Sequence, residues 1–129
     1  MENLPLKGIK VIDAASFIAA PLVSALMSDY GAEVIKIEPL TGDTYREAVI
    51  GGHVWPESEI DWAFILENRN KRSLSIDLKS KEGQLILKKL LKDTDAFVTN
   101  LPKTPREKLR LTNSIIRKIN PRIIYASLT

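Results

Sequence analysis

Basic residues gather in two segments of the second half of the chain, where their side chains could bind an anion. The first group lies in and just after ENRNKRSLSIDL (67–78) and consists of Arg69, Lys71, Arg72 and Lys79. The second group lies in LPKTPREKLRL (101–111) and consists of Lys103, Arg106, Lys108 and Arg110. Lysine ammonium groups and free backbone N–H groups together can hold a phosphate-bearing ligand. The residue types therefore predict an anion-binding site in this half of the chain.

The two halves of the chain carry opposite net charges. Residues 1–66 carry a net charge of −6 and residues 67–129 carry +9, which together give +3. Such a split suggests an anionic partner for the second half, although a solvated surface or an acidic neighbouring chain would also explain it. Nucleic acid is the competing anion. It is disfavoured because aromatic residues are only 6% of the chain and are not interleaved with the basic ones, and no DNA-binding motif occurs.

Other kinds of site find little support in the sequence. No G-x-G-x-x-G follows the first predicted strand, where Ala14, Ala15 and Ser16 stand instead, and no G-x-x-x-x-G-K-[ST] occurs. A nicotinamide cofactor or an NTP is therefore disfavoured. One histidine and no cysteine disfavour a metal site. The histidine, His53, lies in a long loop and is expected to be an ordinary surface residue.

Several other polar and aromatic residues are expected to serve the fold rather than a reaction. Asp13 ends the first strand and is expected to hydrogen-bond the turn that follows. Asp43 and Arg46 are expected to form a local ion pair that holds the long loop. Trp55 and Trp62 are expected to be packing residues rather than stacking platforms.

The elements that position these residues follow from hydrophobic periodicity. Strands are predicted at 8–15, 33–39, 72–78, 96–100 and 122–128, the last of them as a buried strand. Helices are predicted from Pro21, over 59–68, over 81–92 and over 112–119. Strand, helix and strand within about 30 residues form a βαβ unit with parallel strands. The alternation predicts an α/β fold, a doubly wound parallel sheet with helices on both faces.

Local signals refine the helices. The first helix carries apolar residues at helical spacing, namely Leu22, Ala25, Leu26 and Tyr30. Asn68 is expected to end the second helix in a left-handed turn. Ser80 is expected to cap the third helix.

The predicted sheet places the two basic groups differently. Lys79 and the 101–110 loop both follow strands, and the carboxyl ends of parallel strands share one edge, where ligands bind in open α/β sheets. We therefore expect them to share one rim. Arg69, Lys71 and Arg72 enter their strand from the opposite end and are not expected to reach that site.

Size and composition limit the remaining possibilities. A chain of 129 residues suits one domain, and 44% hydrophobic with 27% charged residues is an ordinary globular balance. No apolar run approaches the ~18–20 residues of a membrane span, and MENLPLKG does not read as a secretory signal. A cytoplasmic location is compatible with the absence of cysteine.

Five stretches of the chain match a known family in order. They are LKGIKVIDAASFIAAP (6–21), SDYGAEVIKIEPLTGDTYR (28–46), NRNKRSLSIDLKSKEG (68–83), DAFVTN (95–100) and INPRIIYASLT (119–129). With these stretches the chain resembles the N-terminal part of the family III CoA-transferases, which include formyl-CoA transferase, carnitine CoA-transferase and α-methylacyl-CoA racemase. NRNKRSLSIDLKSKEG is the most specific of them. One departure is Pro39, which stands where formyl-CoA transferase has an arginine.

The resemblance implies a Rossmann-like fold that is incomplete relative to the family. Residues 1–129 would form a single N-terminal domain that takes the adenosine-phosphate end of CoA or acyl-CoA. The implied CoA contacts are Ile76, Lys79, Asn100, Leu101 and Lys108, and the implied neighbours of the pantetheine and acyl end are Phe17 and Ile18. No metal is implied.

The resemblance also implies what the chain leaves out. The family's catalytic aspartate lies beyond residue 129, so no catalytic role falls on this chain. The expected function is therefore the CoA-binding portion of a transferase that moves CoA between carboxylic acids when completed by the missing part. Family members form interlocked dimers, and a homo-oligomer or a complementary C-terminal subunit is the expected partner. A racemase-type fragment and a non-catalytic binding or assembly module are the alternatives.

Overall fold

The computed structural model describes residues 3–47 and 61–128, so His53 and Trp55 lie outside the described residues. The elements in chain order are β1 (Lys10–Asp13), α1 (Ala19–Asp29), β2 (Glu33–Glu38), the 3-10 helix η1 (Thr44–Glu47), α2 (Trp62–Asn68), β3 (Arg72–Ser75), α3 (Lys81–Leu91), β4 (Ala96–Thr99), α4 (Lys103–Lys108), α5 (Asn113–Ile119) and β5 (Ile124–Ser127). All five predicted strands are present, each shorter than its apolar run.

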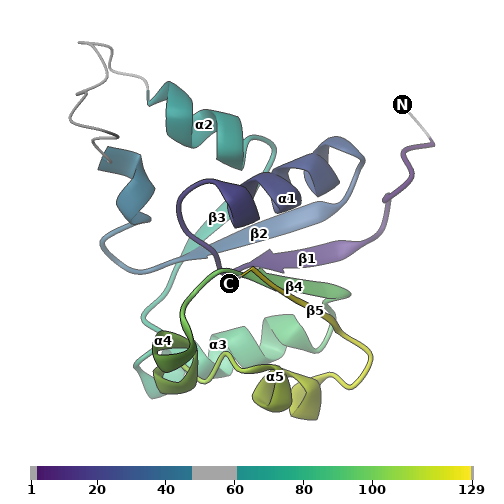
Figure 1. Cartoon of the computed structure of the whole chain (residues 1–129). Helices are drawn as coiled ribbons and strands as arrows, with labels where there is room; N and C mark the ends of the chain where they lie inside the picture. The colour runs from purple at the N-terminus through teal and green to yellow at the C-terminus, as the bar shows by residue number, and fades with distance from the viewer. Residues whose placement is uncertain (1–2, 48–60, 129) are drawn as a thin grey trace.

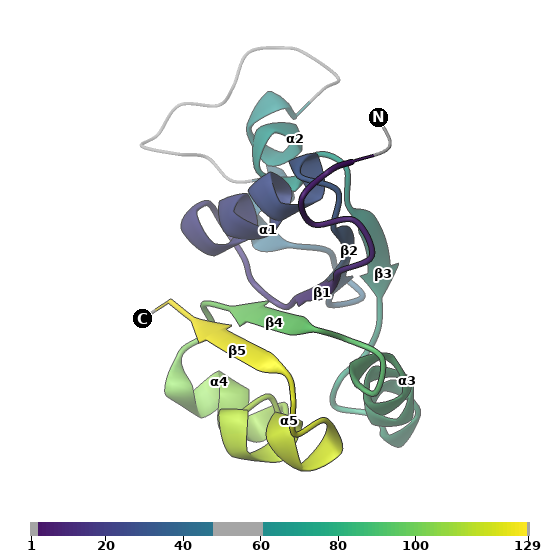
Figure 2. The same cartoon turned by 90° about the vertical axis from the view of Figure 1, so that its right-hand side faces the viewer.

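The strands form one parallel sheet in the order β3-β2-β1-β4-β5. Helices α1 and α2 cover one face, and α3, α4 and α5 cover the other (Figure 1). Figure 2 shows the same two helical layers after a quarter turn. The prediction of an α/β, Rossmann-like sheet is thereby confirmed. The strand order reverses between β1 and β4, and at such a switch point the following loops diverge and leave a crevice.

Each face of the sheet has its own hydrophobic core, because successive strand residues point to opposite faces. The larger core lies under α3 and α5 and includes Ile12, Ile37, Leu87, Phe97 and Ile116. The smaller core lies under α1 and includes Val11, Ala15, Ala20, Val34 and Val98. The small side chains of this second core let α1 approach the sheet closely.

Helix α1 was predicted correctly, and of the four apolar residues at helical spacing Ala25 is buried and Leu22 half-buried. Its buried residues are Ala20, Pro21, Ser24 and Ala25. Leu26 and Tyr30 are 45% and 56% exposed. The buried face is made of small residues, which a search for large apolar side chains passes over.

Three local predictions on α2 and β5 were wrong. The left-handed residue after α2 is Asn70, at φ 61°, rather than Asn68. Trp62 does not pack into the core, since 63% of it is exposed. Strand β5 is not buried, because it lies at an edge of the sheet and Ile124 is 67% exposed.

The turn before α3 is set by two local contacts. Ser80 caps the helix as predicted, and its Oγ accepts a hydrogen bond from the Gly83 N–H at 2.9 Å. A Cβ on Gly83 would lie 2.0 Å from the carbonyl oxygen of Asp77, so only glycine allows this approach. The first turn of α3 therefore lies directly against the backbone of Asp77.

Candidate functional site

A cleft of about 390 Å³ opens at the carboxyl ends of β1, β2, β3 and β4. It lies at the carboxyl edge of the sheet, where sequence reasoning placed the ligand, and its lining spans the switch point between β1 and β4. Its lining residues are Ala14, Ala15, Ser16, Ile37, Glu38, Pro39, Leu40, Thr41, Ile76, Asp77, Leu78, Lys79, Leu101, Leu109 and Leu111.

Most of this lining is apolar, and several of its residues rest on the larger hydrophobic core. The exposed Lys79 supplies a positive charge at the opening. A pocket with apolar walls and few polar groups suits a flat, uncharged ring, and a cation at its edge suits an anionic substituent of that ring.

Ile76, Lys79 and Leu101, three of the predicted ligand contacts, line this cleft together. Ile76 is buried in its floor, and Leu101 follows β4. Lys79 is held by its backbone, whose N–H donates to Asp77 Oδ1 at 2.9 Å. The expectation that Lys79 and the 101–110 loop share one rim is confirmed.

Asn100 and Lys108 lie beside the cleft rather than in it. Asn100 uses its side chain on the backbone of Ser16: Oδ1 accepts from the Ser16 N–H at 2.9 Å, and Nδ2 donates to the Ser16 carbonyl at 2.7 Å. Lys108 is exposed at the end of α4, next in sequence to Leu109, which lines the cleft.

Phe17 and Ile18 follow Ser16 on the loop that leaves the cleft, and both are largely exposed. Phe17 has φ 65°, in the left-handed region that a bulky residue rarely adopts. Its ring centroid lies 6.0 Å from that of Tyr45. The structure therefore brings these two residues to the neighbourhood of the cleft but not into its lining.

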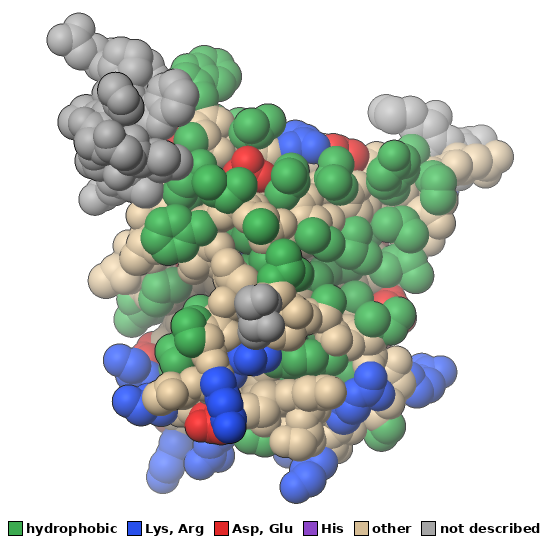
Figure 3. All heavy atoms as spheres, viewed as in Figure 1, with side chains coloured by type: hydrophobic (Ala, Val, Ile, Leu, Met, Phe, Trp, Pro, Cys, Tyr) green, Lys and Arg blue, Asp and Glu red, His purple; other side chains and the backbone are tan. Residues whose placement is uncertain are grey.

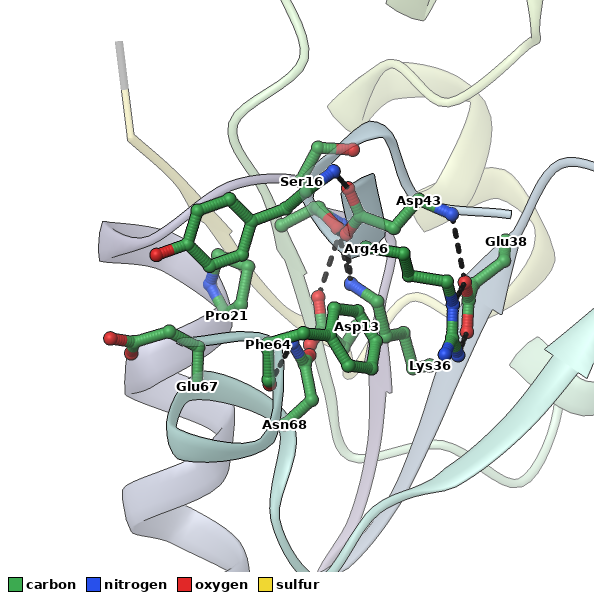
Figure 4. Close-up of polar contacts among 12 residues, drawn as sticks. Asp13, Ser16, Pro21, Lys36, Glu38, Asp43, Arg46, Phe64, Glu67 and Asn68 are labelled. Atoms are coloured by element: carbon green, nitrogen blue, oxygen red, sulfur yellow. Dashed lines mark hydrogen bonds and ion pairs between the residues drawn. The ribbon is translucent and has the colours of Figure 1, made fainter. Parts of the chain in front are cut away.

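A group of buried charges supports the sheet beside this loop (Figure 4). Glu38 receives two hydrogen bonds from the Arg46 guanidinium, at 2.7 and 2.8 Å, and a third from Ser73 Oγ at 2.6 Å. Burial alone would raise the pKa of Glu38, but these bonds and one from the Asp43 N–H outweigh it and lower the pKa to about 2. Arg46 also lies over the Phe64 ring, 3.9 Å from its centroid.

The predicted pairing of Asp43 with Arg46 was wrong, because Asp43 pairs with Lys36. Lys36 Nζ lies 2.7 Å from Asp43 Oδ2, with both side chains almost completely buried. Lys36 sits on a central strand, between two covered faces, where a charge is costly unless it is paired. The nearest cation in sequence, Arg46, is taken by Glu38.

Asp13 bonds the turn after β1, as predicted: its Oδ1 accepts from the Ala15 N–H at 3.0 Å. It also pairs with Lys71, whose Nζ lies 2.7 Å from Asp13 Oδ2. Burial lowers the pKa of Lys71, and the nearby Asp13 carboxylate opposes that shift. Lys71 is thus an internal structural residue.

Arg69 and Arg72, the two other cations near the start of β3, also have partners within the fold. Arg69 binds Asp29 on α1, and Arg72 lies 3.6 Å from Glu33 on β2. None of them lines the cleft, which agrees with their predicted position at the other end of the strand. Figure 3 shows that lysines and arginines gather over the layer of α3, α4 and α5, while hydrophobic side chains dominate the layer of α1 and α2.

Sequence reasoning missed the internal charges and much of the cleft lining. A usable signal was present, since Lys36 and Glu38 alternate with apolar residues on a strand predicted to be buried on both faces. Within residues 3–47 and 61–128 no group of His, Cys, Asp and Glu side chains could hold a metal ion. None of the helices described here is long and apolar enough to cross a membrane.

Comparison with known proteins agrees with this arrangement. The model of CoA-transferase family III matches residues 6–129. An (R)-2-hydroxy-4-methylpentanoate CoA-transferase from Clostridioides difficile is 44% identical over 125 residues, which cover 95% of this chain and 31% of that protein. The beta subunit of succinyl-CoA--L-malate CoA-transferase from Chloroflexus aurantiacus is 39% identical, covering 98% of this chain and 31% of that one.

Solved structures give the same result. A CAIB/BAIF family protein from Brucella suis superposes with a TM-score of 0.86 at 33% identity, over 99% of this chain and 34% of that one. The hypothetical protein Rv3272 from Mycobacterium tuberculosis superposes with a TM-score of 0.85 at 31% identity. The chain spans about a third of the length of the relatives that it matches. The parallel sheet, the cleft at its switch point and these matches together establish that this chain belongs to CoA-transferase family III.

Proposed function

We propose that this chain is the CoA-binding N-terminal portion of a family III CoA-transferase, in which residues 1–129 act as one domain. The observation that carries the proposal is the cleft at the sheet's switch point, with Ile76 and Leu101 in its lining and Lys79 at its opening. Completed by the remaining part of the enzyme, the domain would serve the transfer of CoA between carboxylic acids. The chemical step itself falls on residues outside this chain.

The chemistry of CoA fits the lining of the cleft. Its adenine ring is flat and uncharged and would lie with its faces between Ile76 and Leu101, while its phosphates are anionic and would meet Lys79 and Lys108 at the rim. Asn100 would act through its contact with Ser16, by fixing the loop that borders the cleft. Phe17 and Ile18, exposed on the same loop, would face the pantetheine and acyl end.

The relatives favour transferase over racemase chemistry, because the two named above are CoA-transferases. An acyl-CoA and a carboxylic acid are accordingly the proposed substrates. A second copy of the chain or a complementary C-terminal polypeptide is the proposed protein partner. Exposed apolar residues on α1 and α2 support such an association, namely Leu26, Ile65 and Leu66. A chain without cysteine suits a cytoplasmic location.

Calorimetric titration with CoA and with dephospho-CoA tests the proposal. We expect CoA to bind, and Lys79→Ala to weaken it about 10- to 100-fold, because one charge-assisted contact is worth about 1.5–3 kcal/mol. Lys81→Ala is the matched control, since Lys81 is also exposed but does not line the cleft. A weaker response to dephospho-CoA would assign a rim cation to the 3′-phosphate.

Two outcomes would replace the proposal. Absence of CoA binding together with tight, salt-sensitive RNA or DNA binding would make the basic layer a nucleic-acid surface. CoA binding without transfer activity, even after the C-terminal two-thirds of a relative is supplied, would leave a non-catalytic binding module.

A further inference from the structure

Lys36 contacts both the loop after β1 and the loop after β2, and these two loops form opposite walls of the cleft. One wall, called here the β1–α1 wall, consists of Ala14, Ala15 and Ser16. The other, called the β2–η1 wall, consists of Pro39, Leu40 and Thr41. We propose that Lys36 is a positioning residue that sets the spacing of these walls and thereby the affinity of the cleft for CoA. This inference rests on the proposed function.

The contacts of the ammonium group carry the inference. Lys36 Nζ donates to the Ala15 carbonyl at 2.8 Å, inside the β1–α1 wall. The same atom lies 2.7 Å from Asp43 Oδ2, and Asp43 is separated from the β2–η1 wall only by Gly42. The Lys36 side chain is only 2% exposed, so both contacts are shielded from water. A single buried cation therefore holds two loops that are adjacent in space and separate in sequence.

The segment that ends at Asp43 is stiff enough to transmit this contact. The Gly42 N–H donates to the Pro39 carbonyl at 2.8 Å, which closes a turn across the wall. Asp43 is fixed at both ends, because its N–H donates to Glu38 Oε2 and its Oδ1 accepts from the Tyr45 N–H. A displaced Asp43 would therefore carry the β2–η1 wall with it.

Stability alone is a weak reason for this charge. Replacing a buried ion pair by apolar residues of similar volume is often neutral or stabilising. Among the described residues, Asp43 Oδ2 has no hydrogen-bond partner, so the ion pair with Lys36 is its compensation. An ammonium carries three donors and can reach two loops at once, which no apolar side chain does.

Lys71 is the natural control, because it is equally buried and equally paired. Its side chain is 2% exposed, and Nζ lies 2.7 Å from Asp13 Oδ2. Its other partners are the carbonyls of Pro21 and Glu67 and Oδ1 of Asn68. None of these four residues lines the cleft. A variant at Lys71 thus reproduces the loss of a buried cation without touching the β2–η1 wall. On the other side of the cleft its partner Asp13 keeps the hydrogen bond that Oδ1 accepts from the Ala15 N–H.

The test compares Lys36→Met with Lys71→Met in the whole chain, by CoA calorimetry and by amide hydrogen exchange. For Lys36→Met we expect a Kd for CoA raised about tenfold or more, with faster exchange at Gly42, Asp43 and Tyr45. For Lys71→Met we expect a Kd within about threefold of wild type and unchanged exchange at those amides, whatever its stability. If Lys36→Met folds poorly, Asp43→Asn takes its place in the test, because it keeps the shape of the side chain but removes its charge. It should give the same rise in Kd and the same faster exchange.

The outcomes separate this inference from the proposed function. If wild type binds no CoA, the proposed function fails, and unchanged exchange in Lys36→Met would then overturn the positioning role as well. If wild type binds CoA and Lys36→Met binds it equally well, or if Lys71→Met loses as much affinity, the inference alone is overturned.

Discussion

Ser16 and Asn100, 84 residues apart in the sequence, exchange two hydrogen bonds across the carboxyl ends of β1 and β4. The pair closes the switch point of the sheet at the place where strand order reverses. It also anchors the start of the loop that carries Phe17 in a left-handed conformation. Both ends of the Asn100 amide are used, because its oxygen accepts from the Ser16 N–H and its nitrogen donates to the Ser16 carbonyl.

Asn100→Asp should destabilise the fold by about 1–3 kcal/mol, measured by urea unfolding at pH 7. The new carboxylate can still accept from the Ser16 N–H. Its second oxygen, however, would face the Ser16 carbonyl where Nδ2 now donates. Asn100→Ala loses both bonds without that repulsion and should be the milder variant. Equal stability of wild type and Asn100→Asp would contradict this account.

Glu38 should make the fold sensitive to acid. Its pKa falls from 4.5 to about 2 on folding, so the folded state binds this proton less readily than the unfolded state. The stability from this group is therefore complete above about pH 4.5 and is lost as the pH falls toward 2, by on the order of 3 kcal/mol in all. Urea unfolding between pH 6 and pH 2.5 measures the loss.

Glu38→Gln should lower the free energy of unfolding at pH 6. It should also make that free energy fall less steeply between pH 6 and pH 2.5 than it does in wild type. Glu82→Gln, at an exposed position in the first turn of α3, is the control and should keep the wild-type decline. A decline in Glu38→Gln as steep as in wild type would assign the acid sensitivity to other carboxylates.

Gly83→Ala should be strongly destabilising although alanine is the better helix former. The added Cβ would lie 2.0 Å from the Asp77 carbonyl oxygen, so α3 or residues 77–79 must shift. Overpacking of this kind typically costs about 1–3 kcal/mol. Because Asp77 and Lys79 line the cleft, CoA affinity should fall too. Urea unfolding and CoA calorimetry check the two effects, and a stabilised Gly83→Ala would refute the steric argument.

The apolar layer of α1 and α2 should make the isolated chain self-associate. Leu26 and Leu66 are large, exposed apolar residues on these neighbouring helices. Leu26→Glu combined with Leu66→Glu should shift sedimentation equilibrium toward monomer with little change in thermal stability. Leu85→Glu, on α3 in the opposite layer, should not. Equal association of all three proteins would place the contact elsewhere.

Local patterns were sufficient to predict the five strands, their direction and four of the five α-helices that the structure describes, while α4 stands where a loop was expected. Alternating apolar runs and helical segments indicated five parallel strands, and Ser80, a residue type favoured at helix N-caps, indicated the start of α3. The rule that ligands gather at the carboxyl ends of parallel strands placed Lys79 and the 101–110 loop at one rim. These features depend on residues that are near one another in sequence, or on the geometry common to all parallel sheets.

Long-range pairing, in contrast, depends on how the chain packs. Arg46 is the cation nearest to Asp43 in sequence, but Arg46 pairs with Glu38 and Asp43 pairs with Lys36. Both partners, Lys36 and Glu38, are buried residues of β2 that lie next to the same loop. Likewise Lys71 reaches Asp13 across 58 residues. A buried charge must be paired, and which partner is within reach depends on how strands and loops pack. The amino-acid pattern was therefore enough to specify the family, the strand direction and the edge that holds the cleft, while packing selected the side chains that keep the cleft in shape.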